Sequence, residues 1–260
     1  MILVFDVGNT ETTVGLFDGV SLRGHWRLTT VPERTPDELA LVIAQLLRFA
    51  NADPREIDGA AIASVVPAIT GPLAEACEGL TGHRAIVVNG GSPLPIRLEV
   101  DEPLSVGADR LINTLAASQL YHRDTIVVDL GTATTFDCIT ANGTFLGGAI
   151  APGVRTSADS LTRRTAKLPS TELVAPRRAI GTRTEECIRA GVVFGAADAI
   201  DGMVRRIKRE WPGGVVPWVV ATGGLAKVIQ PYCESFDLVA PNLTLEGLRL
   251  AYDLLVTPQA

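Results

Sequence analysis

The chain begins with the stretch Ile2-Leu3-Val4-Phe5-Asp6-Val7-Gly8-Asn9-Thr10, which decides its fold. An apolar run that ends in an acid and a polar, glycine-containing turn is typical of a buried strand that reaches a loop. A second apolar run, residues 14–17, follows the turn and ends at Asp18-Gly19. The stretch therefore predicts a strand, a turn and a returning strand at the start of the fold.

The same pattern returns 123 residues later. The run 126–128 leads into Asp129-Leu130-Gly131-Thr132, and a second apolar run, 135–139, ends at Asn142-Gly143. Two matching units, each with strands and turns on both sides of an Asp-x-Gly triplet, indicate duplicated halves. We therefore predict two domains, residues 1–118 and residues 119–260.

Between these units, short apolar runs alternate with stretches of helical spacing. Thr35, Pro36 and Glu38 match the N-cap, first residue and capping box of a helix whose apolar face follows in 39–47. Further helices are expected near 73–80, 105–120, 185–210 and 245–255, and strands near 60–66, 85–88, 145–150 and 218–221. This alternation predicts an α/β fold in which helices cover sheets.

Composition narrows the class of protein. The 260 residues are 47% hydrophobic and 20% charged, as in a globular chain. A net charge of −6 and an aromatic fraction of 5% disfavour nucleic-acid binding, because like charges repel and few rings are available for stacking. No apolar run reaches the roughly 18 residues of a membrane span, no basic leader opens the chain, and no Cys-x-x-Cys pair is present. We therefore expect a cytoplasmic protein that binds neither nucleic acid nor membrane.

The two Asp-x-Gly turns contain groups that can bind a ligand. Gly8 and Gly131 permit tight turns whose N–H groups converge on a phosphate oxygen, and the neighbouring threonines add hydroxyl donors. A carboxylate such as Asp6 repels phosphate unless Mg²⁺ lies between them. Each turn alone is common in β-hairpins. Two such turns together can hold a nucleoside triphosphate, and the backbone of the Gly223-Gly224 turn can lie close to its nucleoside. No Walker motif and no dinucleotide-binding glycine motif is present.

Six segments resemble the type III pantothenate kinases, which belong to the acetate and sugar kinase, Hsp70 and actin superfamily. They are 6–10, Gly107-Ala108-Asp109-Arg110, 129–137, 147–153, 221–226 and 243–249, in the order of that family along the chain. The resemblance implies two duplicated ribonuclease H-like (actin-like ATPase) domains. Each is expected to be a mixed sheet flanked by helices, with a nucleotide cleft between the two.

The resemblance also implies a function. The family phosphorylates the primary hydroxyl of pantothenate with ATP, the first committed step of coenzyme A synthesis, and forms homodimers. It implies a monovalent cation, potassium or ammonium, on Asp129, and pantothenate against Gly107, Ala108, Asp109, Arg110 and Thr184 near a subunit interface. It implies the ATP phosphates on Asp6, Val7, Gly8, Asn9, Thr10, Glu11, Thr12, Thr13 and Thr132.

Four of these positions also have a purely structural interpretation. Asp129 can form an Asx turn, although a carboxylate buried between two strands is costly without a cation. Asp109 can accept the proton of the attacking hydroxyl, or it can simply stabilise a helix start through the macrodipole. Arg110 can pair with the carboxylate of pantothenate, or it can be a surface arginine. Thr182 and Glu185 have capping-box spacing, so Thr184 beside them enters the site only through the resemblance.

Some features depart from the family or stay unexplained. Glu11 occupies a position that is often polar and uncharged, so its acid either weakens nucleotide binding or points to solvent. The tyrosine that many relatives carry before Gly-Ala-Asp-Arg is absent, since this chain has Glu99-Val100-Asp101-Glu102 there. Residues 155–183 hold seven basic and two acidic residues, which either steer anions or form a solvated face.

Two other functions stay open on the sequence. One is a different small-alcohol or acid kinase built on the same duplicated scaffold. The other is a nucleotide-sensing regulator that binds ATP without turning it over, although such a sensor requires no base beside the terminal phosphate.

Overall fold

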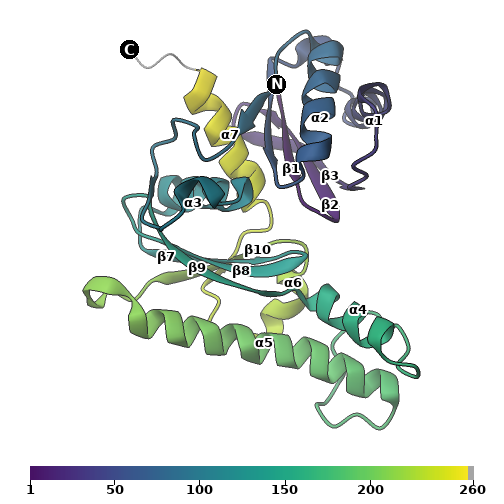
Figure 1. Cartoon of the computed structure of the whole chain (residues 1–260), viewed down its shortest axis with the longest axis vertical. Coiled ribbons are helices and arrows are strands. Elements are labelled where there is room, and N and C mark those ends of the chain that lie inside the picture. The colour runs from purple at the N-terminus through teal and green to yellow at the C-terminus, as the bar shows by residue number, and fades with distance from the viewer. Residues whose placement is uncertain (257–260) are drawn as a thin grey trace. The chain divides into compact units, whose positions relative to one another are not determined.

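A computed structural model describes residues 1–256 of the chain (Figure 1). It divides into two compact units, one formed by residues 1–120 together with the C-terminal segment from Leu243, the other by residues 121–242. Each unit contains a mixed sheet flanked by helices. The α/β class predicted from the alternating pattern is confirmed.

The first unit is built on a five-stranded sheet of order β3-β2-β1-β4-β5, in which β1 is antiparallel to β2 and parallel to β4. A short strand, β6 (Arg97–Leu98), follows along the chain. The strands of the sheet are β1 (Ile2–Val7), β2 (Glu11–Asp18), β3 (Ser21–Thr29), β4 (Gly59–Ser64) and β5 (Ile86–Val88). The helices of this unit are α1 (Pro36–Phe49), α2 (Pro67–Thr81), α3 (Ala108–Tyr121) and α7 (Leu243–Val256).

Alternation along β1 divides the first unit into two cores, because successive strand residues point to opposite faces. Leu3 and Phe5 pack with the buried faces of α1 and α2. Val4 packs instead with Ile112 of α3 and Leu248 of α7. Asp6 lies two residues after Val4 on the same face of β1. It therefore lies at the end of the face that α3 and α7 cover.

The second unit repeats this order. Its strands run β11-β10-β7-β8-β9, and β7 is antiparallel to β8 and parallel to β10, as β1 is to β2 and β4. The strands are β7 (Thr125–Leu130), β8 (Ala133–Ile139), β9 (Thr144–Pro152), β10 (Trp218–Thr222) and β11 (Leu238–Val239), and the helices are α4 (Val154–Arg164), α5 (Thr184–Glu210) and α6 (Ala226–Ile229). The duplication predicted from the two Asp-x-Gly units is therefore present in the topology.

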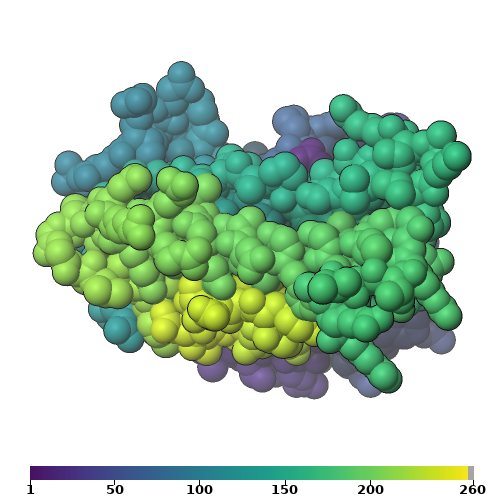
Figure 2. Space-filling view, turned by 90° about the horizontal axis from the view of Figure 1, so that it is seen from below, coloured from purple at the N-terminus to yellow at the C-terminus, as the bar shows by residue number. Residues whose placement is uncertain are grey.

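Helix α5 covers one face of this second sheet (Figure 1) and runs unbroken through Gly191, Gly195 and Gly202. Glycine costs a helix about 1 kcal/mol relative to alanine, but Val193 and Ile200 are fully buried against Val128 and its neighbours in the sheet. The packing of the apolar face of α5 on the sheet thus outweighs the low helix propensity of its three glycines. The outer surface of α4 and α5 lies open to solvent (Figure 2).

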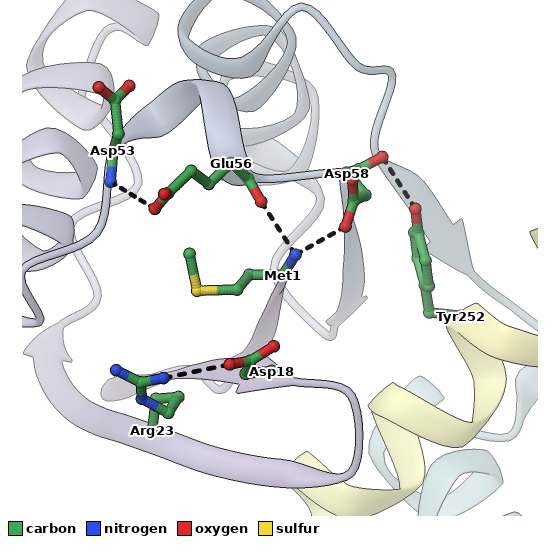
Figure 3. A network of polar contacts seen from close by, with 7 residues as sticks. All are labelled: Met1, Asp18, Arg23, Asp53, Glu56, Asp58 and Tyr252. Atoms are coloured by element: carbon green, nitrogen blue, oxygen red, sulfur yellow. Dashed lines mark hydrogen bonds and ion pairs between the residues drawn. The ribbon is translucent and has the colours of Figure 1, made fainter.

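The C-terminal helix lies in the first unit, whereas the sequence-based boundary 119–260 assigned it to the second. Helix α7 packs on β1 and β4, and its Tyr252 hydroxyl donates to the Asp58 carbonyl at 3.0 Å (Figure 3). Beside it, the Met1 ammonium donates to the Asp58 carboxylate at 2.6 Å and to the Glu56 carbonyl at 2.9 Å. An amphipathic helix packs against an apolar sheet face that no other element covers, and Val4 and its neighbours form such a face here.

The capping box predicted for the first helix is present. The Thr35 hydroxyl accepts from the Glu38 N–H at 3.3 Å, and the Glu38 carboxylate accepts from the Thr35 N–H at 2.9 Å. Because the cap satisfies otherwise unpaired N–H groups, Thr35→Ala is expected to lower the free energy of unfolding by about 1 kcal/mol in urea denaturation. Thr35→Ser keeps the oxygen and serves as the control. Equal stability of all three proteins contradicts the assignment.

The capping box predicted at Thr182 and Glu185 is wrong. Helix α5 begins at Thr184 after Arg183, which makes no side-chain cap. The N–H and hydroxyl of Thr182 donate instead to the Glu186 carboxylate, at 3.0 and 3.2 Å. Thr182 lies one residue outside the cap, so its bonds reach four residues ahead rather than three, and the backbone bond from Thr182 lowers the pKa of Glu186.

Within the described part of the chain, no helix is both long enough and apolar enough to cross a membrane.

Candidate functional site

The first Asp-x-Gly turn closes the hairpin between β1 and β2. The Gly8 N–H donates to the Glu11 carbonyl at 3.0 Å, which leaves Asn9 and Thr10 exposed at the tip. In the ladder, Asp6 lies opposite Thr13, and both are partly buried. The hairpin therefore presents a carboxylate and a hydroxyl on one face, next to a two-residue tip.

Thr12 faces the other way. It lies opposite Val7, is only 6% exposed, and its hydroxyl is 2.8 Å from that of Thr30. The Thr30 hydroxyl donates in turn to the Gly8 carbonyl at 2.7 Å. Thr12 thus braces the turn from the core side, while Thr13 shares the face of Asp6. The period-two alternation of a strand separates these two neighbouring threonines.

The second turn repeats this geometry with one residue fewer at the tip. The Gly131 N–H donates to the Ala133 carbonyl at 3.0 Å, and the single residue between them, Thr132, lies exposed at the tip. Asp129 lies opposite Thr135, as Asp6 lies opposite Thr13. The Thr132 carbonyl accepts from the Gly153 N–H at 3.2 Å and from the Thr156 hydroxyl at 2.6 Å, so the start of α4 is anchored on this turn.

The turn after β10 lies against the Asp129 carboxylate. Gly223 has φ +88°, and a Cβ on it would lie 2.4 Å from Asp129 Oδ1 and 2.7 Å from the Leu130 nitrogen. Only glycine tolerates both this backbone conformation and this close approach. The Leu225 N–H donates to the Leu130 carbonyl at 3.4 Å and closes the turn over the end of β7.

Asp109 lies in the first turn of α3 and is partly buried. Its Oδ1 accepts from the Arg110 N–H at 2.9 Å and lies 2.5 Å from where a Cβ on Gly107 would be. A methyl of Val65 lies 3.5 Å from that same point, and the Val65 N–H donates to the Val7 carbonyl at 3.0 Å. Asp109 is therefore placed beside the carboxyl ends of β1 and β4.

This placement brings Asp109 to the same edge of the first sheet as Asp6, and to the face that α3 and α7 cover. In open α/β sheets, ligands bind outside the carboxyl ends of parallel strands. A polar pocket of about 380 Å³ that includes Met1, Arg23 and Asn51 lies instead where β1 begins, so it is separate from this edge. Among residues 1–256, no group of three His, Cys, Asp or Glu is arranged to hold a metal ion by itself.

Glu11, the unusual acid of the first turn, is exposed and pairs with Arg27 of β3 at 3.4 Å. The neighbouring strand β3 therefore partly compensates the charge of Glu11. Thr184 is the exposed first residue of α5, after the irregular segment 165–183. All seven basic residues of 155–183 are exposed as well.

A family model described as type III pantothenate kinase matches residues 2–206. The chain belongs to the type III pantothenate kinases. A protein of that name from Moorella thermoacetica is 45% identical over 255 residues, covering 97% of this chain and 99% of its own. One from Listeria monocytogenes is 41% identical over 252 residues, covering 97% and 96%. As a member of this family, the chain is a kinase.

Solved structures support the fold of this kinase. Component A of the (R)-2-hydroxyglutaryl-CoA dehydratase of Acidaminococcus fermentans has a TM-score of 0.55 at 17% identity, covering 96% of this chain and 95% of its own. The ROK hexokinase of Thermus thermophilus has a TM-score of 0.51 at 16% identity, covering 96% and 97%. At such identities the likeness concerns the fold alone, and the predicted actin-like, duplicated architecture is confirmed.

Sequence reasoning missed two features of the site. Gly107 and Gly223 each lie against a carboxylate, Asp109 and Asp129, a contact that the predicted substrate and nucleoside roles did not include. Thr222, which lies opposite Asp129 in the sheet, received no role. No local signal could have identified the contacts of Thr222 and Gly223, since both reach Asp129 only through the pairing of β10 with β7.

Proposed function

We propose that this protein transfers the terminal phosphoryl group of ATP to the primary hydroxyl of pantothenate, giving 4′-phosphopantothenate for coenzyme A synthesis. The observation that carries the proposal is the family match over residues 2–206, together with relatives named type III pantothenate kinase over nearly their full length. The N–H groups of Gly8 and Gly131 close the two turns themselves. The two Asp-centred hairpins support the proposal, because each ends in an exposed tip with a threonine whose hydroxyl is suited to a phosphate oxygen.

The ATP phosphates would bind at the first turn, residues 6–13, and at Thr132. Asp6 is expected to act through Mg²⁺, which takes oxygen ligands and is usually held by one or two carboxylates plus phosphates. Asp6 and Thr13, side by side on one face, fit that requirement without a larger cluster. When bound, Mg²⁺ neutralises charge on the phosphates, and the turn residues orient them.

A potassium or ammonium ion would bind at Asp129. The side chains around this carboxylate fit such an ion, because its neighbours in the sheet, Thr135 and Thr222, offer only oxygen donors. The close approach of Gly223 confines the carboxylate. When bound, the cation adds positive charge beside the second turn.

Asp109 would act as the general base. The Arg110 N–H holds Oδ1, which leaves Oδ2 to accept the proton of the pantothenate hydroxyl as the new P–O bond forms. The Arg110 side chain would pair with the pantothenate carboxylate, and Gly107, Ala108 and Thr184 would complete the substrate contacts. Positioning and charge compensation are the main contributions that a protein makes to phosphoryl transfer.

The active form would be a homodimer in the cytoplasm. Thr184 lies in a different unit from residues 107–110, and in the homodimer we expect it to contact pantothenate near the subunit interface. All four cysteines are unbridged, as suits a reducing compartment. Sedimentation of the purified protein tests the dimer.

An ADP-release assay tests the function, run with and without pantothenate in sodium and in potassium buffers. We expect ADP only when ATP, pantothenate and potassium or ammonium are all present. ADP formation with another alcohol or acid acceptor, but not with pantothenate, would assign a different substrate to the same scaffold. ATP binding without ADP formation for any acceptor would favour a regulator and refute the proposal.

The ion pair of Glu11 and Arg27 leads to a prediction for ATP binding. Arg27→Ala leaves the Glu11 charge uncompensated beside the phosphates, so we expect the Kd for ATP to rise about two- to fivefold, since an exposed pair contributes at most about 1 kcal/mol. Isothermal titration calorimetry measures the change. Arg23→Ala is the matched control, because it changes another arginine of β3 and breaks its pair with Asp18 of β2.

The double variant Arg27→Ala with Glu11→Gln removes both charges. Its Kd for ATP is expected to return to the value of the unmodified protein. A Kd that stays raised would mean that Arg27 contacts the nucleotide itself rather than acting on Glu11.

A further inference from the structure

The Asp129 carboxylate lies between two threonines in the second sheet. The ladder places Asp129 opposite Thr135 on β8 and opposite Thr222 on β10. Residues opposite each other on neighbouring strands share a face, and the strands lie about 4.8 Å apart. A cation between two such strands can therefore contact oxygens from both.

This row lies on the face turned away from α5. The neighbouring residues Val128 and Ala221 are buried in the core that α5 covers, so Asp129 and Thr222 point to the opposite side. Thr222 is 1% exposed, whereas Asp129 is partly exposed. The row therefore combines an accessible carboxylate with a hydroxyl held in a rigid, buried strand.

The first sheet lacks the corresponding hydroxyl. Asp6 lies opposite Thr13 on β2, but its neighbour on β4 is Ala63. In the two rows that contain these aspartates, Thr222 in place of Ala63 is the side chain that distinguishes the surroundings of Asp129 from those of Asp6. A difference of one hydroxyl is a physical basis for a cation at one aspartate and not at the other.

The turn after Thr222 restricts the carboxylate further. A Cβ on Gly223 would lie 2.4 Å from Asp129 Oδ1, so the backbone that follows Thr222 closes against that oxygen. Thr222 and Gly223 thus act on Asp129 from the same side, one with a hydroxyl and one by close contact. Oxygen ligands such as a carboxylate suit hard cations.

We propose that the Thr222 hydroxyl is a ligand of the monovalent cation held by Asp129. This inference rests on the proposed function in one respect, that a cation binds at Asp129. It adds a binding residue from β10, 93 residues further along the chain, to a site otherwise assigned to a single turn.

Thermal unfolding without nucleotide tests the proposal, with potassium chloride titrated against choline chloride at constant ionic strength. A cation that binds only the folded protein raises Tm as its concentration exceeds Kd. Thr222→Val preserves the shape of the side chain and removes the oxygen, whereas Thr222→Ser keeps the oxygen. Thr125→Val makes the same change at a buried threonine at the other end of strand β7.

We expect potassium to stabilise the unmodified protein and Thr125→Val at the same concentrations. For the same rise in Tm, Thr222→Val should need at least about tenfold more potassium, which corresponds to about 1.4 kcal/mol. The potassium concentration that Thr222→Ser needs should stay within about threefold of that of the unmodified protein. The Tm in choline alone reports whether each variant folds. Thr222→Ala, which removes the oxygen without adding bulk, replaces the valine variant if that protein does not fold.

Two results would overturn the proposal: equal potassium dependence of Thr222→Val and the unmodified protein, or no stabilisation of the unmodified protein by potassium or ammonium. The ADP-release assay separates this failure from that of the proposed function. If pantothenate-dependent ADP release persists and both proteins need the same potassium concentration, only the role of Thr222 falls. If the unmodified protein releases no ADP with pantothenate, the proposed function falls independently.

Discussion

Asp109→Asn is expected to lower kcat for pantothenate-dependent ADP formation by about 10²–10⁴-fold, the range that general base catalysis contributes. The amide keeps the size of the side chain but cannot accept the hydroxyl proton. Because Asp109 is expected to contact the acceptor alcohol rather than the nucleotide, the Kd for ATP should change by less than about threefold, a difference of under 1 kcal/mol. Steady-state kinetics and calorimetry measure the two quantities.

Asp37→Asn is the matched control for this variant. Asp37 is an exposed acid in the first turn of α1, as Asp109 is an acid in the first turn of α3. If both acids act only through the helix macrodipole, the two variants should lose similar small amounts of stability, about 0.3–1 kcal/mol each, and keep their activity. An Asp109→Asn protein that retains most of its kcat would refute the general-base assignment.

Gly107→Ala is expected to lower kcat by about 10- to 100-fold, since a displacement of about 1 Å in a reacting group can cost that much. The new methyl would lie 2.5 Å from Asp109 Oδ1, so the carboxylate must move away from the Arg110 N–H that orients it. The KM for ATP should stay unchanged, because the first turn is not disturbed.

A double-mutant cycle shows whether Gly107 acts through Asp109. In the Asp109→Asn background, Gly107→Ala should have little further effect on kcat, because the carboxylate that it displaces is already absent. Additive losses would mean that the proposed contact of Gly107 with pantothenate, rather than its effect on the Asp109 carboxylate, accounts for the loss. Thermal unfolding of each variant checks that the start of α3 remains folded.

The local features of the fold could be read from the sequence because they depend on residues close together in the chain. Thr35 and Glu38 form the expected capping box, and Gly8 and Gly131 lie in the expected turns. The start of α5 could not be read in the same way. Thr182 has one acid three residues ahead, at the capping-box spacing, and another four residues ahead, and only the path of the preceding segment decided for Glu186.

Long-range features needed the tertiary structure. The position of α7 depended on which sheet had an uncovered apolar face. That face is formed by β1 and β4, which are far from α7 in the sequence, so the helix sequence alone does not predict it. The different roles of Thr12 and Thr13 followed from the strand face on which each lies. The family resemblance identified Asp109, but its position beside β1 and β4 came from the contacts of Val65.

The sequence by itself thus determined the α/β class, the duplicated Asp-x-Gly hairpins and the kinase family, because these are recorded in periodicity, turn residues and motif order. Only the tertiary structure decided which side chains accompany each aspartate. Strand pairing joins Asp129 to Thr222 and Asp6 to Ala63, and no local pattern along the chain encodes that pairing. It depends instead on how buried strands align when their apolar faces pack together.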